Sequence, residues 1–167
     1  SVLVNSGKVP VIVPSLLSNV LFSYDNSTYF LLEGTINSVG SLFKWLEGFI
    51  DITHEKMNWD KRCITETDGI VVPGLNGISA PYWTGEFETQ FFELDKKSDP
   101  DKIIRAGMES IGFLIYDICE VIRKKAKIEL SDIVASGGSS RASLLQFIAD
   151  ILRTDIATTS GKDMTAL

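Results

Sequence analysis

The sequence predicts an α/β fold, a mixed central β-sheet with helices on both faces. Three β-rich segments open the chain, and amphipathic helical patterns then alternate with short apolar segments. Strands that meander first and then alternate with helices are typical of a mixed sheet covered by helices. With 167 residues, of which 44% are hydrophobic, the chain is long enough for one domain with its own core.

The opening strands are predicted at Val2–Asn5, Asn19–Tyr24 and Ser27–Leu32, and each ends at turn-forming residues. The two residues between the second and third strands, Asp25-Asn26, favour a tight hairpin. We therefore expect the chain to open as a meander of strands.

The next element is an amphipathic helix. Thr35 is placed to cap it. Gly40 lies inside the helical pattern, where a glycine costs about 1 kcal/mol relative to alanine. This glycine needs a reason, either close packing of the helix or the close approach of a ligand. The apolar residues of the helix recur at spacings of three and four: Ile36, Val39, Phe43, Leu46 and Ile50.

Residues 51–68 are polar and irregular, with one short helix expected. Short strands are predicted at 69–74 and Thr89–Leu94, on either side of a loop rich in turn residues and aromatics. The longest helix starts with Asp99 as N-cap and Pro100 at its first position. Its buried stripe is Ile104, Met108, Ile111, Ile115, Ile118 and Ile122.

After this helix a strand is predicted at Ile128–Ser136, followed by a helix and by a strand at Asp155–Thr159. The sequence begins inside a strand and stops at Asp163–Leu167, where a further helix would begin, so we expect a fragment of a longer protein. The helix between the two strands buries Leu144 or Leu145, Ile148 and Leu152.

Composition excludes several classes of function. The formal net charge of −6 argues against a nucleic-acid or anionic membrane partner, because either needs a basic face. No apolar run approaches the roughly 20 residues that span a bilayer, and we expect no signal segment. Cys63 and Cys119 form no short-spaced motif and imply no disulfide framework. A reduced, cytoplasmic protein is the expectation.

A glycine pair, Gly137-Gly138, follows the apolar segment Ile133–Ser136 and precedes the last amphipathic helix. Two glycines let the backbone turn sharply and bring its amides close to a ligand. The N-terminus of the helix that follows suits a phosphate-bearing partner. Because strand–Gly-Gly–helix turns are common in α/β proteins, a simple tight turn remains the alternative.

Three stretches carry a family resemblance when taken together. The stretch Val72–Gly77 through Ala80–Trp83 resembles a P-x-x-x-G-x-x-A-P-Y-W loop. The stretch that starts at Ser136–Gly138 resembles a G-G…L-x-Q-F-x-x-D-I-L…T-A-L run. In this order, and over nearly the whole chain, they resemble the C-terminal domain of FGGY carbohydrate kinases, glycerol kinases in particular. The stretches are Tyr29–Gly40 with Trp45-Leu46, Val72–Gly77 through Ala80–Trp83, and Ser136–Gly138 with Leu144–Leu152 and Thr165–Leu167.

The resemblance implies an actin-like ATPase (ribonuclease-H-like) domain. Residues 1–167 would be a single domain, the C-terminal nucleotide-binding half of a two-domain kinase whose N-terminal domain is absent. That kinase would transfer the γ-phosphate of ATP to a hydroxyl of glycerol or a related polyol. The N-terminal domain would supply the polyol site and the aspartate base, so we expect no catalytic residue and no activity in this fragment alone. ATP or ADP would bind here, with Mg²⁺ held mainly by ATP and the absent domain. A homodimer stays open as the assembly state.

The same resemblance implies the site residues. Gly137 and Gly138 would lie against the nucleotide, with Ser139 and Arg141 near it. Gly40 matches a family glycine close to the nucleotide. Lys44 stands where glycerol kinases often carry a glutamine that approaches the nucleotide. The alternative interpretation of Lys44 is an ordinary solvated lysine. For Ser139 and Ser140 the alternative interpretation is helix capping.

The loop after the glycine pair departs from the family pattern. Glycerol kinases usually show Ala-x-Ala-Asn-Asn there, with an asparagine that contacts the base, whereas this chain has Ser139–Ser143 and is one residue shorter. Gluconate and xylulose kinases place a basic residue in this loop. The alternatives are therefore a kinase for gluconate or xylulose, or a non-catalytic actin-like interaction domain. Pro81–Trp83 is expected to be a packed structural loop, and Glu109 to make structural hydrogen bonds.

Overall fold

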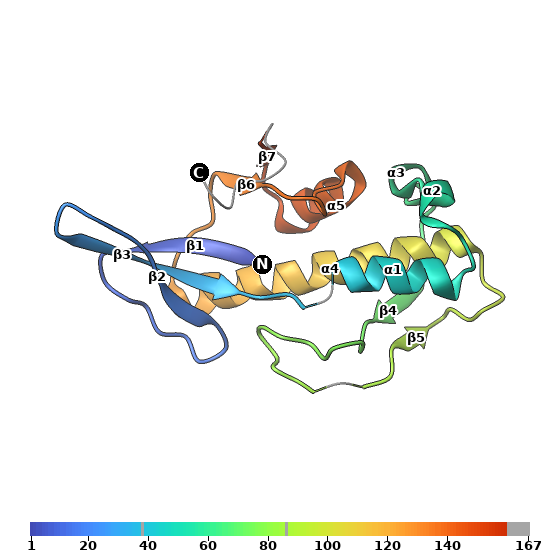
Figure 1. Cartoon of the computed structure of the whole chain (residues 1–167), viewed down its shortest axis with the longest axis horizontal. Coiled ribbons are helices and arrows are strands. Elements are labelled where there is room, and N and C mark those ends of the chain that lie inside the picture. The colour runs from blue at the N-terminus through green and yellow to red at the C-terminus, as the bar shows by residue number, and fades with distance from the viewer. Residues whose placement is uncertain (38, 86, 160–167) are drawn as a thin grey trace.

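A computed structural model of the chain describes residues 1–37, 39–85 and 87–159, and its elements are labelled in Figure 1. The expectations for Ser38 and for residues 160–167, including the Thr165–Leu167 motif, lie outside the described residues. The elements are β1 (Val2–Gly7), β2 (Leu17–Tyr24), β3 (Ser27–Gly34), α1 (Val39–Phe49), α2 (His54–Met57), α3 (Trp59–Arg62), β4 (Ile70–Val72), β5 (Gln90–Phe92), α4 (Pro100–Val121), the π-helical turn η1 (Ile122–Ala126), β6 (Ile133–Ala135), α5 (Ala142–Leu152) and β7 (Ile156–Thr158).

The opening strands form an antiparallel sheet in the order β1-β3-β2, which confirms the predicted meander. Asp25 and Asn26 connect β2 to β3 with φ values of 46° and 57°. Two consecutive left-handed residues give a type I′ turn, whose twist matches that of the flanking strands. The predicted hairpin is confirmed.

The remaining strands pair separately. β4 and β5 are antiparallel, and β6 and β7 are parallel. The α/β class is confirmed, but the described strands form three sheets where one continuous central sheet was expected. Residues of β1 and of β6 both line a cavity of about 680 Å³, and no ladder joins these two strands.

The expected helices on both faces of the sheet are also only partly seen. Val2 and Val4 of β1 pack into a core cluster with Ile118 and Ile122 at the C-terminal end of α4. Leu3 lies between the two valines and points to the opposite face, where it is 60% exposed. Within the described part of the chain, α4 therefore covers one face of β1 and leaves Leu3 open.

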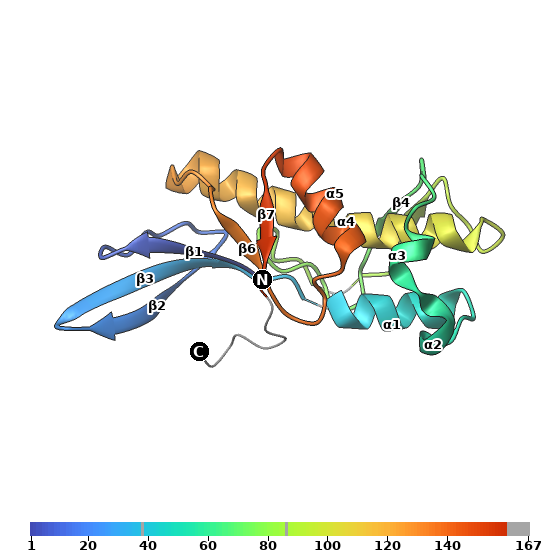
Figure 2. The same ribbon diagram turned by 90° about the horizontal axis from the view of Figure 1, so that it is seen from above.

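Helix α4 runs along the long axis of the molecule, and the β2–β3 hairpin extends beyond its C-terminal end (Figure 1). Residues of α4 belong to both core clusters. The Asp101 N–H donates to Asp99 Oδ1 at 2.9 Å, and Pro100 opens the helix, as the sequence predicts. The predicted stripe is buried except at Ile115, which is half-buried and lines the cavity. Figure 2 shows α1 beside α4 and α5 across it.

Two glycines of α4 let its neighbours approach closely. A side chain at Gly107 would overlap Leu46 of α1, and one at Gly112 would overlap the ring of Phe147 of α5. Because only a hydrogen occupies each position, the two helices rest directly on the α4 backbone. The core around them consists of buried residues from α1, α4, α5 and the α2–α3 segment: Leu42, Phe43, Leu46, Met57, Trp59, Cys63, Ile103, Ile104, Met108, Ile111, Cys119, Leu144, Ile148 and Leu152.

Helix α1 begins at Val39, so the prediction that Thr35 caps it is wrong. The Thr35 hydroxyl instead donates to Glu33 Oε1 at 3.2 Å, and the Thr35 carbonyl accepts the Ala80 N–H at 3.2 Å. Tertiary pairing with the aromatic loop keeps these residues out of the helix.

The loop at Pro81–Trp83 is held by side-chain hydrogen bonds, although it is less packed than expected, because Tyr82 is 53% and Trp83 is 49% exposed. The Tyr82 hydroxyl donates to Asp117 Oδ2 of α4 at 2.7 Å, and this contact raises the pKa of Tyr82 to about 12. Trp83 Nε1 donates to the Ser15 carbonyl at 3.0 Å. The loop thereby joins the β1–β2 connection to α4.

Replacing Gly34 with alanine should destabilise the fold. A methyl group there would overlap the side chain of Ile118, which is fully buried, so we expect a loss of roughly 1–3 kcal/mol in urea unfolding. Gly48→Ala is the matched control: it lies in α1 with open space around it and should gain about 0.5–1 kcal/mol. Equal effects of the two substitutions would contradict the packing role of Gly34.

Candidate functional site

The glycine pair forms an exposed turn between β6 and α5. Gly137 has φ +98°, a conformation that favours glycine, and a side chain at Gly137 or Gly138 would meet no atom of the described residues within 4 Å. The Ser140 N–H donates to the Gly137 carbonyl at 3.1 Å, and the Arg141 N–H to the Ser139 carbonyl at 2.9 Å. The turn is thus ordered by its own backbone, while its outer surface is open to a ligand.

A carboxylate from another helix caps α5. The Asp60 Oδ1 atom, from α3, accepts hydrogen bonds from the Ser143 N–H at 3.0 Å and from the Ser143 hydroxyl at 2.8 Å. These bonds, together with the positive charge of Arg141, hold the pKa of Asp60 below its ordinary value of 3.8. Asp60 therefore takes the capping role that was the alternative for Ser139 and Ser140, and it already neutralises part of the positive end of α5.

Arg141 points inward, toward α1 and α3. Its guanidinium lies 5.3 Å from the ring centroid of Phe43 and 5.4 Å from that of Trp59, two cation–π contacts. The two rings also pack on each other, with centroids 4.3 Å apart. Arg141 therefore holds the glycine turn against the core side of α1 through Phe43, which directly precedes Lys44.

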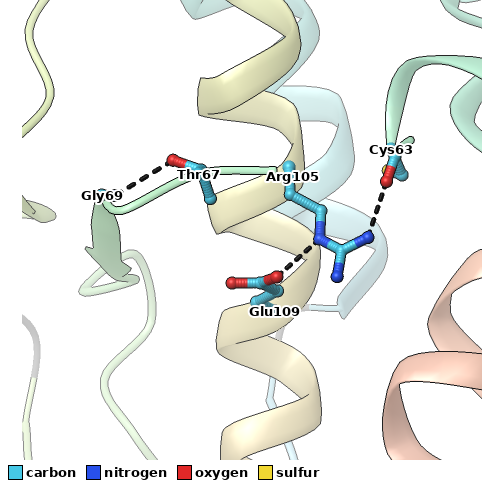
Figure 3. Close-up of polar contacts among 5 residues, drawn as sticks. All are labelled: Cys63, Thr67, Gly69, Arg105 and Glu109. Atoms are coloured by element: carbon cyan, nitrogen blue, oxygen red, sulfur yellow. Dashed lines mark hydrogen bonds and ion pairs between the residues drawn. The ribbon is translucent and has the colours of Figure 1, made fainter. Parts of the chain in front are cut away.

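Arg105 of α4 holds the segment that carries Trp59 and Asp60. Figure 3 shows its guanidinium between two acceptors: Nε donates to Glu109 Oε1 at 2.5 Å, and Nη1 to the Cys63 carbonyl at 2.7 Å. The structural role expected for Glu109 is confirmed. Just beyond, the Gly69 N–H donates to Thr67 Oγ1 at 3.0 Å, which shapes the turn into β4.

The second predicted site segment, Gly40 and Lys44, lies on the exposed side of α1. Among the residues that the structure describes, none has an atom within 4 Å of a side chain placed at Gly40, so close packing against them does not explain this glycine. Its neighbour Val39 lines the same 680 Å³ cavity as Ser139 and Ser140. The structure thus brings the start of α1 and the loop after the glycine pair to one cavity, with Gly40, Gly137 and Gly138 on the open surface outside its lining.

Sequence reasoning missed Asp60 and Trp59. Asp60 lies 83 residues from the Ser143 group that it binds, and Trp59 was noted only as an aromatic in a polar stretch. The one usable signal was the absence of a good N-cap residue at Arg141, directly before α5. A helix that lacks a local cap takes its cap from elsewhere in the fold.

Both cysteines are free and buried, and for Cys119 the sequence predicted a place in the core. Burial raises the pKa of the Cys63 thiol and of the Cys119 thiol to about 11, so both stay protonated at neutral pH. In residues 1–37, 39–85 and 87–159, no helix is long and apolar enough to cross a membrane. The same residues contain no group of three or more His, Cys, Asp and Glu side chains placed to hold a metal ion.

Comparison with known proteins identifies the family. Residues 1–167 match the family described as FGGY family of carbohydrate kinases, C-terminal domain. The chain belongs to this family. One curated relative, the glycerol kinase of Limosilactobacillus reuteri (strain DSM 20016), is 30% identical over 171 residues, which are 99% of this chain and 34% of that protein. The chain thus spans about a third of the length of the curated relatives it matches.

Solved structures of FGGY kinases have the same fold. The glycerol kinase of Plasmodium falciparum, in its crystal structure with ADP, has a TM-score of 0.83 and 28% identity, with 98% of this chain and 34% of that chain covered. The ligand-bound xylulose kinase of Lactobacillus acidophilus has a TM-score of 0.74 and 25% identity, with 94% and 32% covered. The predicted actin-like α/β fold is confirmed.

Removing the Asp60 cap should weaken the fold in a pH-dependent way. Asp60→Ala should lose about 1 kcal/mol in urea unfolding at pH 7, as helix N-caps typically do. Because the pKa of Asp60 is lower in the folded than in the unfolded state, its contribution is complete well above pH 3.8 and is lost as the pH falls below that value. The variant should therefore lose less stability than wild type between pH 5 and pH 3. Glu66→Ala, at an exposed carboxylate, is the control and should follow wild type at both pH values.

Proposed function

We propose that the longer protein is an ATP-dependent carbohydrate kinase and that residues 1–167 supply the adenosine side of its cleft. The acceptor would be a hydroxyl of glycerol or of a related polyol. The observation that carries this proposal is the exposed Gly137-Gly138 turn at the start of α5, with open space where side chains would be, in a chain that matches the FGGY family over its full length. The ADP in the related Plasmodium falciparum structure supports a nucleotide as the ligand.

In this proposal the nucleotide lies against the bare backbone of Gly137 and Gly138 on one side and of Gly40 on the other. The open space at all three glycines supports this placement. Ser139 supplies a hydroxyl at the rim, and Lys44 supplies a positive charge one turn beyond Gly40. Arg141 does not face the nucleotide in this proposal. Its stacking on Phe43 fixes the distance between the glycine turn and α1.

γ-Phosphoryl transfer depends on positioning the reactants and on stabilising the transferred charge. The residues described here bind and orient, so we assign the aspartate base to the other domain. We assign Mg²⁺ chiefly to the phosphates of ATP and to that domain, because the described residues offer no cluster of ligands for it. Buried, protonated thiols support a reducing compartment such as the cytoplasm. A homodimer is the assembly state that the resemblance leaves open, and sedimentation velocity of the longer protein tests it.

Gly138→Ala tests the nucleotide site without straining the fold, because Gly138 has no left-handed φ and no neighbour within 4 Å. A methyl group there should weaken Mg-ADP binding to the longer protein roughly tenfold or more in calorimetry, and Gly40→Ala should do the same. Gly48→Ala, at the other end of α1, is the matched control and should bind as wild type does. If all three variants bind equally well, the nucleotide does not lie against these glycines.

The 167-residue chain offers a finer map. Titration with Mg-ADP should shift the backbone amides of Gly137–Arg141 and of Gly40, with weak affinity because half of the proposed cleft is missing. Shifts at these positions support the kinase. If neither this chain nor the longer protein shows them up to millimolar nucleotide, the adenosine site is lost and the chain is an interaction domain.

The acceptor is tested on the longer protein with a coupled ADP-release assay. We expect the highest kcat/KM with glycerol, compared with gluconate and xylulose. A preference for gluconate or xylulose would instead indicate a gluconate or xylulose kinase. Arg141 favours this alternative, because those kinases place a basic residue in the same loop. No ADP release with any acceptor, despite tight ADP binding, would rule out the kinase.

A further inference from the structure

A second cavity, of about 400 Å³, lies where α3, α4 and α5 meet. In Figure 2, α5 crosses α4, and α3 lies on the side of the N-terminal end of α5. The cavity is open to solvent, and its volume is typical of small-molecule sites. Among the described residues, its lining shares none with the cavity of about 680 Å³. It is therefore a separate concave surface, apart from the glycine turn.

Helix α5 turns a different face to each cavity. Leu144 and Ile148 line the larger one, whereas Ser143, Gln146 and Asp150 line the smaller one. Spacings of three and four residues place these three polar side chains in a row along one face of the helix. Gln146 and Asp150 are exposed, and Gln146 Nε2 donates to Asp150 Oδ1 at 2.8 Å. An exposed pair with this spacing adds little to stability, so the fold depends little on these two side chains.

The polar groups of the lining keep unused hydrogen-bonding capacity. Arg105 uses Nε for Glu109 and Nη1 for the Cys63 carbonyl, which leaves Nη2 without an acceptor among the described residues (Figure 3). Asp60 and Asp150 each engage Oδ1, and within the same part of the chain neither Oδ2 atom accepts a hydrogen bond. The cavity therefore offers donors and acceptors together.

The charges around the cavity nearly cancel. Arg105 is paired with Glu109, and the positive charge of Arg141 acts on Asp60. Asp150 keeps its negative charge, but it is exposed, where water screens it. Charge therefore selects neither a phosphate nor a polyamine, and a neutral ligand fits the cavity better than either.

Apolar side chains complete the lining. Phe147 rests on Gly112 of α4, and the Arg105 guanidinium lies 5.5 Å from the centroid of its ring. Ile64, just after α3, is 73% exposed and lines the same cavity. Apolar surface beside a few polar groups that fix orientation is the usual composition of a small-molecule site.

We propose that this cavity binds a small neutral polyhydroxylated molecule, a polyol or a monosaccharide, at a site apart from the nucleotide surface. Its hydroxyls donate to the free carboxylate oxygens of Asp60 and Asp150 and accept from Arg105, and its C–H groups lie against Phe147 and Ile64. A hydroxyl both donates and accepts, whereas an ammonium group only donates and a phosphate mainly accepts. All of these residues lie between positions 60 and 150, so the site does not depend on the polyol site that we assign to the other domain.

The first test follows isoleucine methyl groups of the longer protein by NMR, without nucleotide, while glycerol or D-xylose is added. Ile64 is the reporter. Ile12, in the β1–β2 connection, is its match, because it is 74% exposed and lies outside the lining. We expect a saturable shift of Ile64 with a Kd of roughly 1–10 mM and no saturable shift of Ile12. A lack of saturation at Ile64 with both probes up to about 100 mM would overturn the proposal.

Three further probes decide the ligand class. 1-Propanol has the carbon chain of glycerol with a single hydroxyl, and it should bind at least about tenfold more weakly, because a site built for hydroxyls rejects an analogue that lacks them. Spermidine and inorganic phosphate should also bind more weakly than glycerol or D-xylose. If any of the three binds as tightly as the better of glycerol and D-xylose, the ligand is not a neutral polyhydroxylated molecule.

Gln146→Leu tests the polar row of α5. The substitution removes a donor and an acceptor from the lining, and it should weaken the binding reported by Ile64 about fivefold. Gln90→Leu is the matched control: Gln90 is the other glutamine of the chain, is exposed on β5 and lies outside the lining. It should bind as wild type does, and equal affinities of the two variants would contradict the proposal. Because neither substitution touches the glycine turn, Mg-ADP binding to the same variants separates a failure of this site from a failure of the kinase proposal.

Discussion

The rest of the structure depends on one helix, α4, whose buried stripe serves two cores at once. Its N-terminal two thirds pack against α1, α5 and the α2–α3 segment, and its last turns pack under the first sheet. A helix this long is stable in water only when an apolar face is covered by neighbours. The contacts of α4 with its neighbours therefore decide where the sheet, the glycine turn and α1 lie relative to one another.

The position of the candidate site is fixed by contacts on the inner side of the glycine turn. The glycine turn has an open outer surface, and its position comes from Arg141 stacked on two rings and from Asp60 bonded to the start of α5. Arg105 anchors the same α3 segment to α4. An open surface whose position is fixed by side-chain contacts on its inner side suits ligand binding. The residues that fix its geometry are then separate from those that would contact the ligand.

The sequence predicted the elements better than their assembly. The Asp25-Asn26 hairpin, the Asp99 cap and the position of the glycine turn follow from local patterns of a few residues, which act wherever they occur. The bond between Asp60 and Ser143 spans 83 residues and has no local pattern, so sequence reasoning did not find it. The division of the sheet was not predicted either, because periodicity shows that a segment is a strand but not which strand lies beside it.

The glycines of α4 have a consequence for the spacing of the helices beside it. Leu46 and Phe147 rest on the hydrogens of Gly107 and Gly112, so the spacing between α1 and α5 is set by two buried positions of α4. A single methyl group at either position would push one helix outward and widen the gap between Gly40 and the glycine turn. The width between α1 and the glycine turn is therefore set on the long helix, at a distance from the proposed nucleotide surface.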